Sequence, residues 1–135
     1  MELNHSHVLI NGFINKPPKD VDSICDWMKR LIKKIKMKPL FAPQAEYVEG
    51  KDGGITCVGV ITTSHCSIHV WDTVKKPYFR FDLYSCKSFD VDDIVNMLDE
   101  FDVHELDVVE IDRNHSIRMV KNFSYCEEEN ADSTY

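Results

Sequence analysis

Three stretches rich in β-branched and aromatic residues follow one another in the middle of the chain, separated only by short connections. They span residues 55–62, 66–71 and 78–84. Such side chains favour strands, and a connection between parallel strands needs a dozen or more residues. The stretches are therefore predicted to pair as antiparallel strands of one sheet.

Two amphipathic helices are predicted outside these strands. The first begins near Asp20 or Asp22, either of which can cap it, carries apolar residues at three- and four-residue spacing, and ends before Pro39. The second follows Asp90 and places apolar residues on one face over residues 91–101. Each helix therefore has one apolar side to bury.

Four further strands are predicted, at residues 7–13, 40–47, 106–111 and 117–123. Strands outnumber helices, and several neighbours are joined by tight turns. We expect an α+β fold: a two-layer sandwich in which a mainly antiparallel sheet carries two helices packed on one face.

The length of 135 residues suits one compact domain, which we assign to residues 1–126. Residues 127–135 carry acidic and small polar side chains without apolar periodicity, and we expect them to form a flexible acidic tail. Five cysteines form no CxxC pair, which favours a reducing compartment over a disulfide framework.

The charge and hydropathy of the chain exclude several classes of partner. The formal net charge of −7 argues against a nucleic-acid partner, because such binding needs a cationic surface. No stretch approaches the roughly 20 apolar residues that span a bilayer, so no membrane association is expected. We expect a cytoplasmic location.

Potentially chemical residues concentrate in the stretch TSHCSIHVW and in the later FDLYSC. Alternation along a strand places His65, Ser67, His69 and Trp71 on one face, away from Cys66. By periodicity alone, a half-exposed strand with its polar side in water is the favoured interpretation.

Two chemical interpretations compete with the half-exposed strand. Zinc ligation would use His65 and His69 with Cys86 or Cys66, but the spacing matches no known zinc motif, and no metal site is predicted. A conventional nucleophile, Ser64 or Cys86 activated by His69, needs a hydrogen-bond geometry that spacing alone does not establish.

The combination of these two motifs resembles the prokaryotic form of the S-adenosylmethionine decarboxylase family. That family has the pattern Ser-His-x-Ser/Thr-Ile-His-Thr-aromatic, followed by an aspartate-hydrophobic-aromatic-Thr/Ser-Cys element. The resemblance extends over about residues 5–113 and is most specific over residues 56–86. It implies a pyruvoyl-dependent enzyme that makes the aminopropyl donor for polyamine (spermidine) biosynthesis.

The resemblance implies a role for each matching residue. Ser64 would attack the carbonyl of Thr63, and the chain would be cut into a β chain, residues 1–63, and an α chain, residues 64–135. Ser64 would become a pyruvoyl group that condenses with the substrate amine, so that no external cofactor is needed. His69 would act as acid and base in this processing, assisted by the hydroxyl of Thr56, and Cys86 would return a proton to the substrate.

The resemblance also implies how S-adenosylmethionine would bind. Trp71 would stack on adenine, with Tyr47 or Phe41 on the opposite side, and Asp72 would bond the ribose hydroxyls. Ordinary packing is an equal alternative for Tyr47 and Phe41. The family further implies a homodimer of αβ units, with sites completed by both copies.

Two alternatives remain open at this point. A related pyruvoyl-dependent arginine or ornithine decarboxylase would keep Ser64, His69 and Cys86, and an unprocessed paralogue would act as a binding or regulatory subunit.

Arg80, which replaces a small residue of the family, would share a strand face with Asp82, and a surface ion pair between them is expected.

Overall fold

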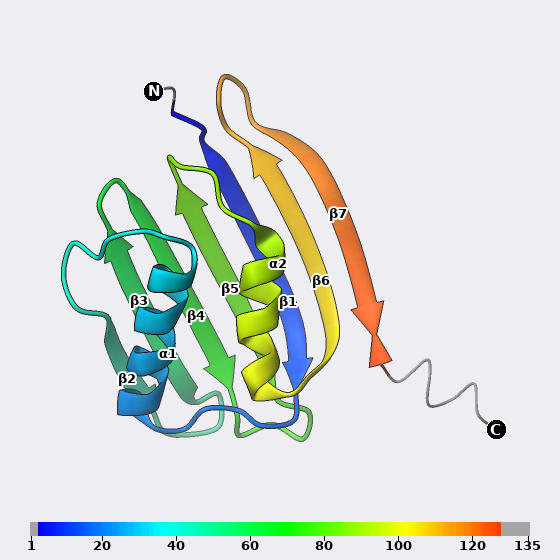
Figure 1. The fold of residues 1–135 in the computed structure, drawn as a ribbon. Helices are drawn as coiled ribbons and strands as arrows, with labels where there is room; N and C mark the ends of the chain where they lie inside the picture. Colours follow the sequence, from blue (N-terminus) through cyan, green and yellow to red (C-terminus); the bar gives the residue numbers. More distant parts are fainter. Residues whose placement is uncertain (1–2, 128–135) are drawn as a thin grey trace.

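In the computed structural model, which describes residues 3–127, the protein is one antiparallel sheet with helices on one side (Figure 1). Seven strands follow the order β2-β3-β4-β5-β1-β6-β7, and every neighbouring pair is antiparallel. The predicted α+β sandwich is confirmed. The strands are β1 (Ser6–Ile14), β2 (Gln44–Val48), β3 (Gly54–Ile61), β4 (Ser64–Trp71), β5 (Tyr78–Ser85), β6 (Val103–Asp112) and β7 (Arg118–Cys126).

Both predicted helices are present, with the expected caps. Helix α1 (Val21–Lys34) begins after Asp20, whose side chain accepts a hydrogen bond from the backbone of Asp22. Helix α2 (Val91–Leu98) begins in the same way after Asp90 and continues into the 3₁₀ turn η1 (Asp99–Phe101). Each cap satisfies a backbone N–H that has no partner within the helix.

Helices α1 and α2 cover the same face of the sheet (Figure 1). Their apolar sides meet alternate residues of the strands, such as Ile10, Ile68 and Phe81, all of which are buried. We call the opposite side, which carries His65, His69 and Trp71, the open face. The side chains of β4 alternate between the two faces as predicted.

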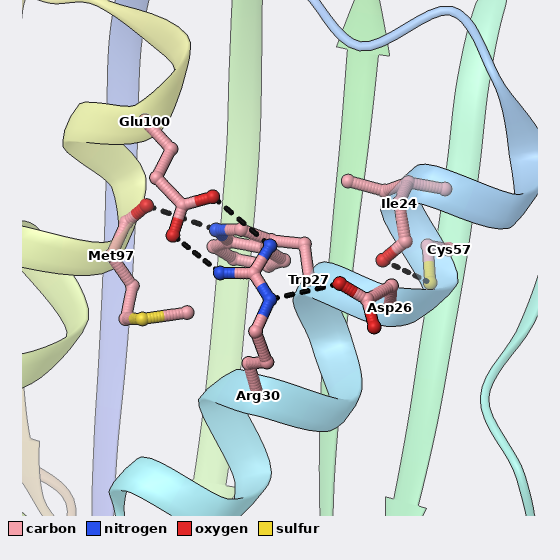
Figure 2. A network of polar contacts seen from close by, with 7 residues as sticks. All are labelled: Ile24, Asp26, Trp27, Arg30, Cys57, Met97 and Glu100. Carbon is pink, nitrogen blue, oxygen red and sulfur yellow. Dashed lines mark hydrogen bonds and ion pairs between the residues drawn. The ribbon is translucent and has the colours of Figure 1, made fainter.

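Polar contacts join α1 to α2 and to the η1 turn that follows it (Figure 2). The indole Nε1 of Trp27 on α1 donates to the carbonyl of Met97 on α2 at 2.9 Å. The guanidinium of Arg30 bonds Glu100 at 2.6 Å and Asp26 at 2.9 Å. The α1–α2 junction therefore combines a buried hydrogen bond with a half-exposed ion-pair network.

Several predicted boundaries differ from the structure by a few residues, most clearly at the start of β2. Strand β2 begins at Gln44, because Leu40 and Phe41 are exposed and only isolated contacts, such as the Leu40 N–H to Val60 carbonyl bond of 2.8 Å, tie this segment to the sheet. The predicted tail, residues 127–135, lies outside the described residues except for Glu127. Among the residues described, no helix has the length and apolar character to cross a membrane.

Candidate active site

The hairpin between β3 and β4 places the predicted cleavage point in a two-residue turn. Ile61 and Ser64 are paired across the hairpin, and Thr62 and Thr63 connect them. Thr63 has a positive φ of 68°. The peptide bond between Thr63 and Ser64 therefore lies where the turn enters β4.

Ser64 meets the end of β5 directly after this turn. Its hydroxyl donates to Ser85 Oγ at 3.3 Å, and the backbone N–H of Cys86 donates to Ser64 Oγ at 3.4 Å. Only 8% of Ser64 and 7% of Cys86 is exposed. Thr63 Oγ1 lies 2.6 Å from Cys86 Sγ. The structure thus brings together three residues predicted for the site: Thr63, Ser64 and Cys86.

A second group of predicted residues lies on the open face. Thr56 and His69 face each other across β3 and β4, and Thr56 Oγ1 is hydrogen-bonded to His69 Nδ1 at 3.0 Å. The ring of His69 lies 6.2 Å from the ring of Trp71. One imidazole nitrogen of His69 is therefore held by a hydrogen bond to Thr56.

The aromatic side chain of Trp71 has a partner that the sequence did not indicate. Tyr78, its cross-strand neighbour on β5, stacks on it with ring centroids 4.8 Å apart and planes inclined by 12°. Tyr78 in turn contacts the guanidinium of Arg80, which lies 4.9 Å from the ring centroid. The Trp71–Tyr78 stack would have been found only by aligning residues 71 and 78 across the connecting turn.

The other predicted substrate-binding residues are joined to each other. The hydroxyl of Tyr47 hydrogen-bonds both carboxylate oxygens of Asp72 at 2.9 Å. This hydrogen bond is the main cause that raises the pKa of Tyr47 above its usual value. Phe41 is 47% exposed in the segment before β2. Asp72 is therefore oriented by Tyr47 directly after Trp71.

The expected ion pair between Arg80 and Asp82 does not form. Asp82 instead bonds the imidazole Nε2 of His7 on β1 at 2.7 Å, and Arg80 Nη1 donates to the carbonyl of Phe79 at 3.0 Å. The prediction considered only one strand. Because β1 lies beside β5 in the sheet, it brings a nearer partner for the carboxylate.

The two groups lie on opposite faces of the sheet. Ser64 follows the alternation of the buried Cys66, whereas His69 follows that of the more exposed Ser67. Within residues 3–127, no hydrogen bond joins His69 to Ser64 or Cys86. One copy of the chain thus does not assemble the conventional nucleophile considered above. The described part of the chain also contains no metal-binding group of three or more His, Cys, Asp or Glu.

The chain shares its fold and its sequence pattern with known proteins. The chain is similar in fold to the crystal structure of the adenosylmethionine decarboxylase from Aquifex aeolicus VF5, with a TM-score of 0.59 and 17% identity, covering 84% of this chain and 92% of that chain. No curated protein sequence matches the chain significantly. Residues 6–114 match the model of a family described as S-adenosylmethionine decarboxylase. The chain therefore belongs to the S-adenosylmethionine decarboxylase family.

Proposed function

We propose that this chain is a pyruvoyl-dependent decarboxylase that cuts itself between Thr63 and Ser64 and decarboxylates S-adenosylmethionine, supplying the aminopropyl donor for spermidine synthesis. The observation that carries the proposal is the placement of Ser64, inside the family match, against Cys86 at the end of a hairpin. A carboxy-lyase of this kind needs no external cofactor, because it makes its electrophile from its own serine.

The self-cleavage begins with the hydroxyl of Ser64. Its oxygen attacks the carbonyl carbon of Thr63, the C–N bond breaks, and an ester replaces the amide while the amine of Ser64 is freed. Loss of the Ser64 α-proton then expels the Thr63 carboxylate, and water releases ammonia to leave a ketone. Ser85 supports the first step, because its oxygen accepts the hydrogen bond of the attacking hydroxyl at 3.3 Å.

Cys86 is the residue that we assign to proton donation. A pyruvoyl group provides a carbonyl electron sink for decarboxylation of a bound amino acid. The side chain of Cys86 is largely shielded from water, and its backbone N–H bonds the residue that would carry this group. A shielded thiol delivers its proton to a nearby carbon without competition from solvent.

His69 and Thr56 require a second copy of the chain in this proposal. They lie on the open face, away from Ser64 of the same copy. We propose a homodimer of αβ units in which each copy contributes to the site of the other. Coexpression of Ser64→Ala and His69→Ala chains tests this: the His69→Ala chain is then cut only if His69 acts from the other copy.

The residues around Trp71 fit an adenine nucleoside. Tyr78 occupies one side of the Trp71 ring, so we propose that adenine stacks on the other side. In this proposal Asp72, which accepts a hydrogen bond from Tyr47, also accepts hydrogen bonds from the ribose hydroxyls. These contacts favour S-adenosylmethionine over arginine or ornithine, which have no aromatic base to stack.

The substrate assignment is tested by measuring carbon dioxide release from S-adenosylmethionine, arginine and ornithine. We expect release to be fastest with S-adenosylmethionine and absent from all three in Ser64→Ala, which lacks the hydroxyl. Faster release from arginine or ornithine would instead identify the chain as an arginine or ornithine decarboxylase. Equal background release by the wild type and Ser64→Ala would instead identify a binding or regulatory subunit.

A further inference from the structure

The backbone at Thr63 is unusual for its residue type. Among residues 3–127, three residues other than glycine have positive φ: Lys36 at 61°, Thr63 at 68° and Asp102 at 57°. Lys36 directly follows the cap of α1, and Asp102 caps η1, where left-handed residues are common. Thr63 alone is β-branched, and its φ is strongly disfavoured for such a side chain.

The turn itself explains why this conformation is imposed. Pairing of Ile61 with Ser64 leaves only Thr62 and Thr63 to reverse the chain. Positive φ occurs only at the second of these two positions, where glycine or asparagine is normally found. Strain is therefore stored at the residue directly before the bond that we propose is cut.

The side chain of Thr63 makes two contacts in this conformation. Its hydroxyl donates to the carbonyl of Thr62 and lies 2.6 Å from the thiol of Cys86. Thr63 itself is exposed, whereas only 7% of Cys86 is. Thr63 therefore stands between Cys86 and solvent.

We propose that Thr63 is a positioning residue that strains the Thr63–Ser64 peptide and covers the thiol of Cys86 until the chain is cut. The proposal rests on the self-cleavage proposed above. After cleavage, Thr63 becomes a chain end whose backbone relaxes, and its hydroxyl is no longer held against the sulfur. Cutting the chain thus makes the proton donor available at the moment when the electrophile forms.

The strain is tested by comparing cleavage rates of three variants. Thr63→Gly removes the Cβ atom and should slow cleavage about 5- to 150-fold, the range expected from releasing one strained residue. Thr63→Ala keeps the Cβ atom but loses the branch at it, so its cleavage should be slowed less than that of Thr63→Gly. Thr62→Gly is the matched control, because it loosens the same turn at a position without positive φ.

The shielding of the Cys86 thiol by Thr63 is tested in the Ser64→Ala background, where the chain stays uncut. Iodoacetamide labelling of Cys86, located by peptide mass spectrometry, should be severalfold faster in Ser64→Ala/Thr63→Ala than in Ser64→Ala. Cys57 and Cys66 serve as internal controls, because burial raises the pKa of both thiols and keeps them unlabelled.

A negative result in either experiment overturns the proposal. Cleavage of Thr63→Gly at the wild-type rate shows that the strain does not act on the bond, and unchanged labelling of Cys86 shows that Thr63 does not cover it. A wild-type chain that is never cut refutes the proposed function instead. The labelling arm still decides the role of Thr63 in that case, since it uses an uncut chain.

Discussion

Cys86 has two separable roles at the level of single residues: its backbone bonds Ser64, whereas its thiol is assigned to proton donation. Replacing the side chain leaves the backbone N–H in place. A substitution at Cys86 therefore tests the thiol in turnover while the backbone contact with Ser64 is kept.

For Cys86→Ala, we expect a chain that folds and is cut but releases carbon dioxide about 10²- to 10⁴-fold more slowly, the usual contribution of a positioned acid or base. Gel electrophoresis follows the cut, and a radiometric assay follows turnover. Cys126→Ala is the control, because Cys126 lies on β7, three strands away from β5 in the sheet, and its thiol bonds Glu105 on the neighbouring β6. Wild-type turnover in Cys86→Ala would remove the thiol from the mechanism.

The sequence predicted candidate site residues but not their separation on two faces of the sheet. The strand was predicted to begin at Cys66, so the prediction assigned Ser64 to neither face of the sheet. The structure extends β4 to Ser64, and five positions of alternation then place Ser64 and His69 on opposite faces. The conformation of Thr63 was equally hidden, because threonine gives no sequence signal for positive φ.

At the level of elements, all seven strands and both helices were predicted, because most of them bury one side against one core; β7, which is exposed along nearly its whole length, was predicted from its residue types alone. Contacts between elements distant in sequence, such as His7 with Asp82, depend on β1 inserting between β5 and β6. No local pattern encodes that strand order. Strand β7 also lies beyond the family match, which ends at residue 114.

The α1–α2 junction gives a stability prediction for these elements. Trp27→Phe keeps most of the packing but removes the Nε1–H that bonds the Met97 carbonyl. We expect the free energy of unfolding to fall by about 1–3 kcal/mol, because the carbonyl loses a buried partner. Urea denaturation measures the change.

Arg30→Gln is the matched comparison at the same junction (Figure 2). Its ion pairs with Asp26 and Glu100 are about half exposed, so the loss should be only about 0–1 kcal/mol. A larger loss for Arg30→Gln than for Trp27→Phe would show that the ion-pair network, rather than the indole, holds the two helices together.

For the whole molecule, buried thiols make the free energy of unfolding decrease as the pH rises in the alkaline range. Burial is the main cause that raises the pKa of Cys57 from 9.0 to about 12. Between these values the folded chain keeps a proton that the unfolded chain has released, so stability falls as pH rises through this window.

Urea denaturation at a series of alkaline pH values checks this dependence. Cys57→Ala should lose stability less steeply with pH than the wild type, although its stability at neutral pH is lower because of the missing sulfur. Parallel slopes for the two proteins would mean that Cys57 does not hold its proton in the folded state.

The central claim is that the chain makes its own electrophile at position 64. Intact mass spectrometry of the purified protein tests this most directly. We predict two polypeptides divided between Thr63 and Ser64, the smaller ending in a free carboxylate and the larger beginning with a ketone in place of an amine. A single full-length chain that persists after prolonged incubation would contradict the account.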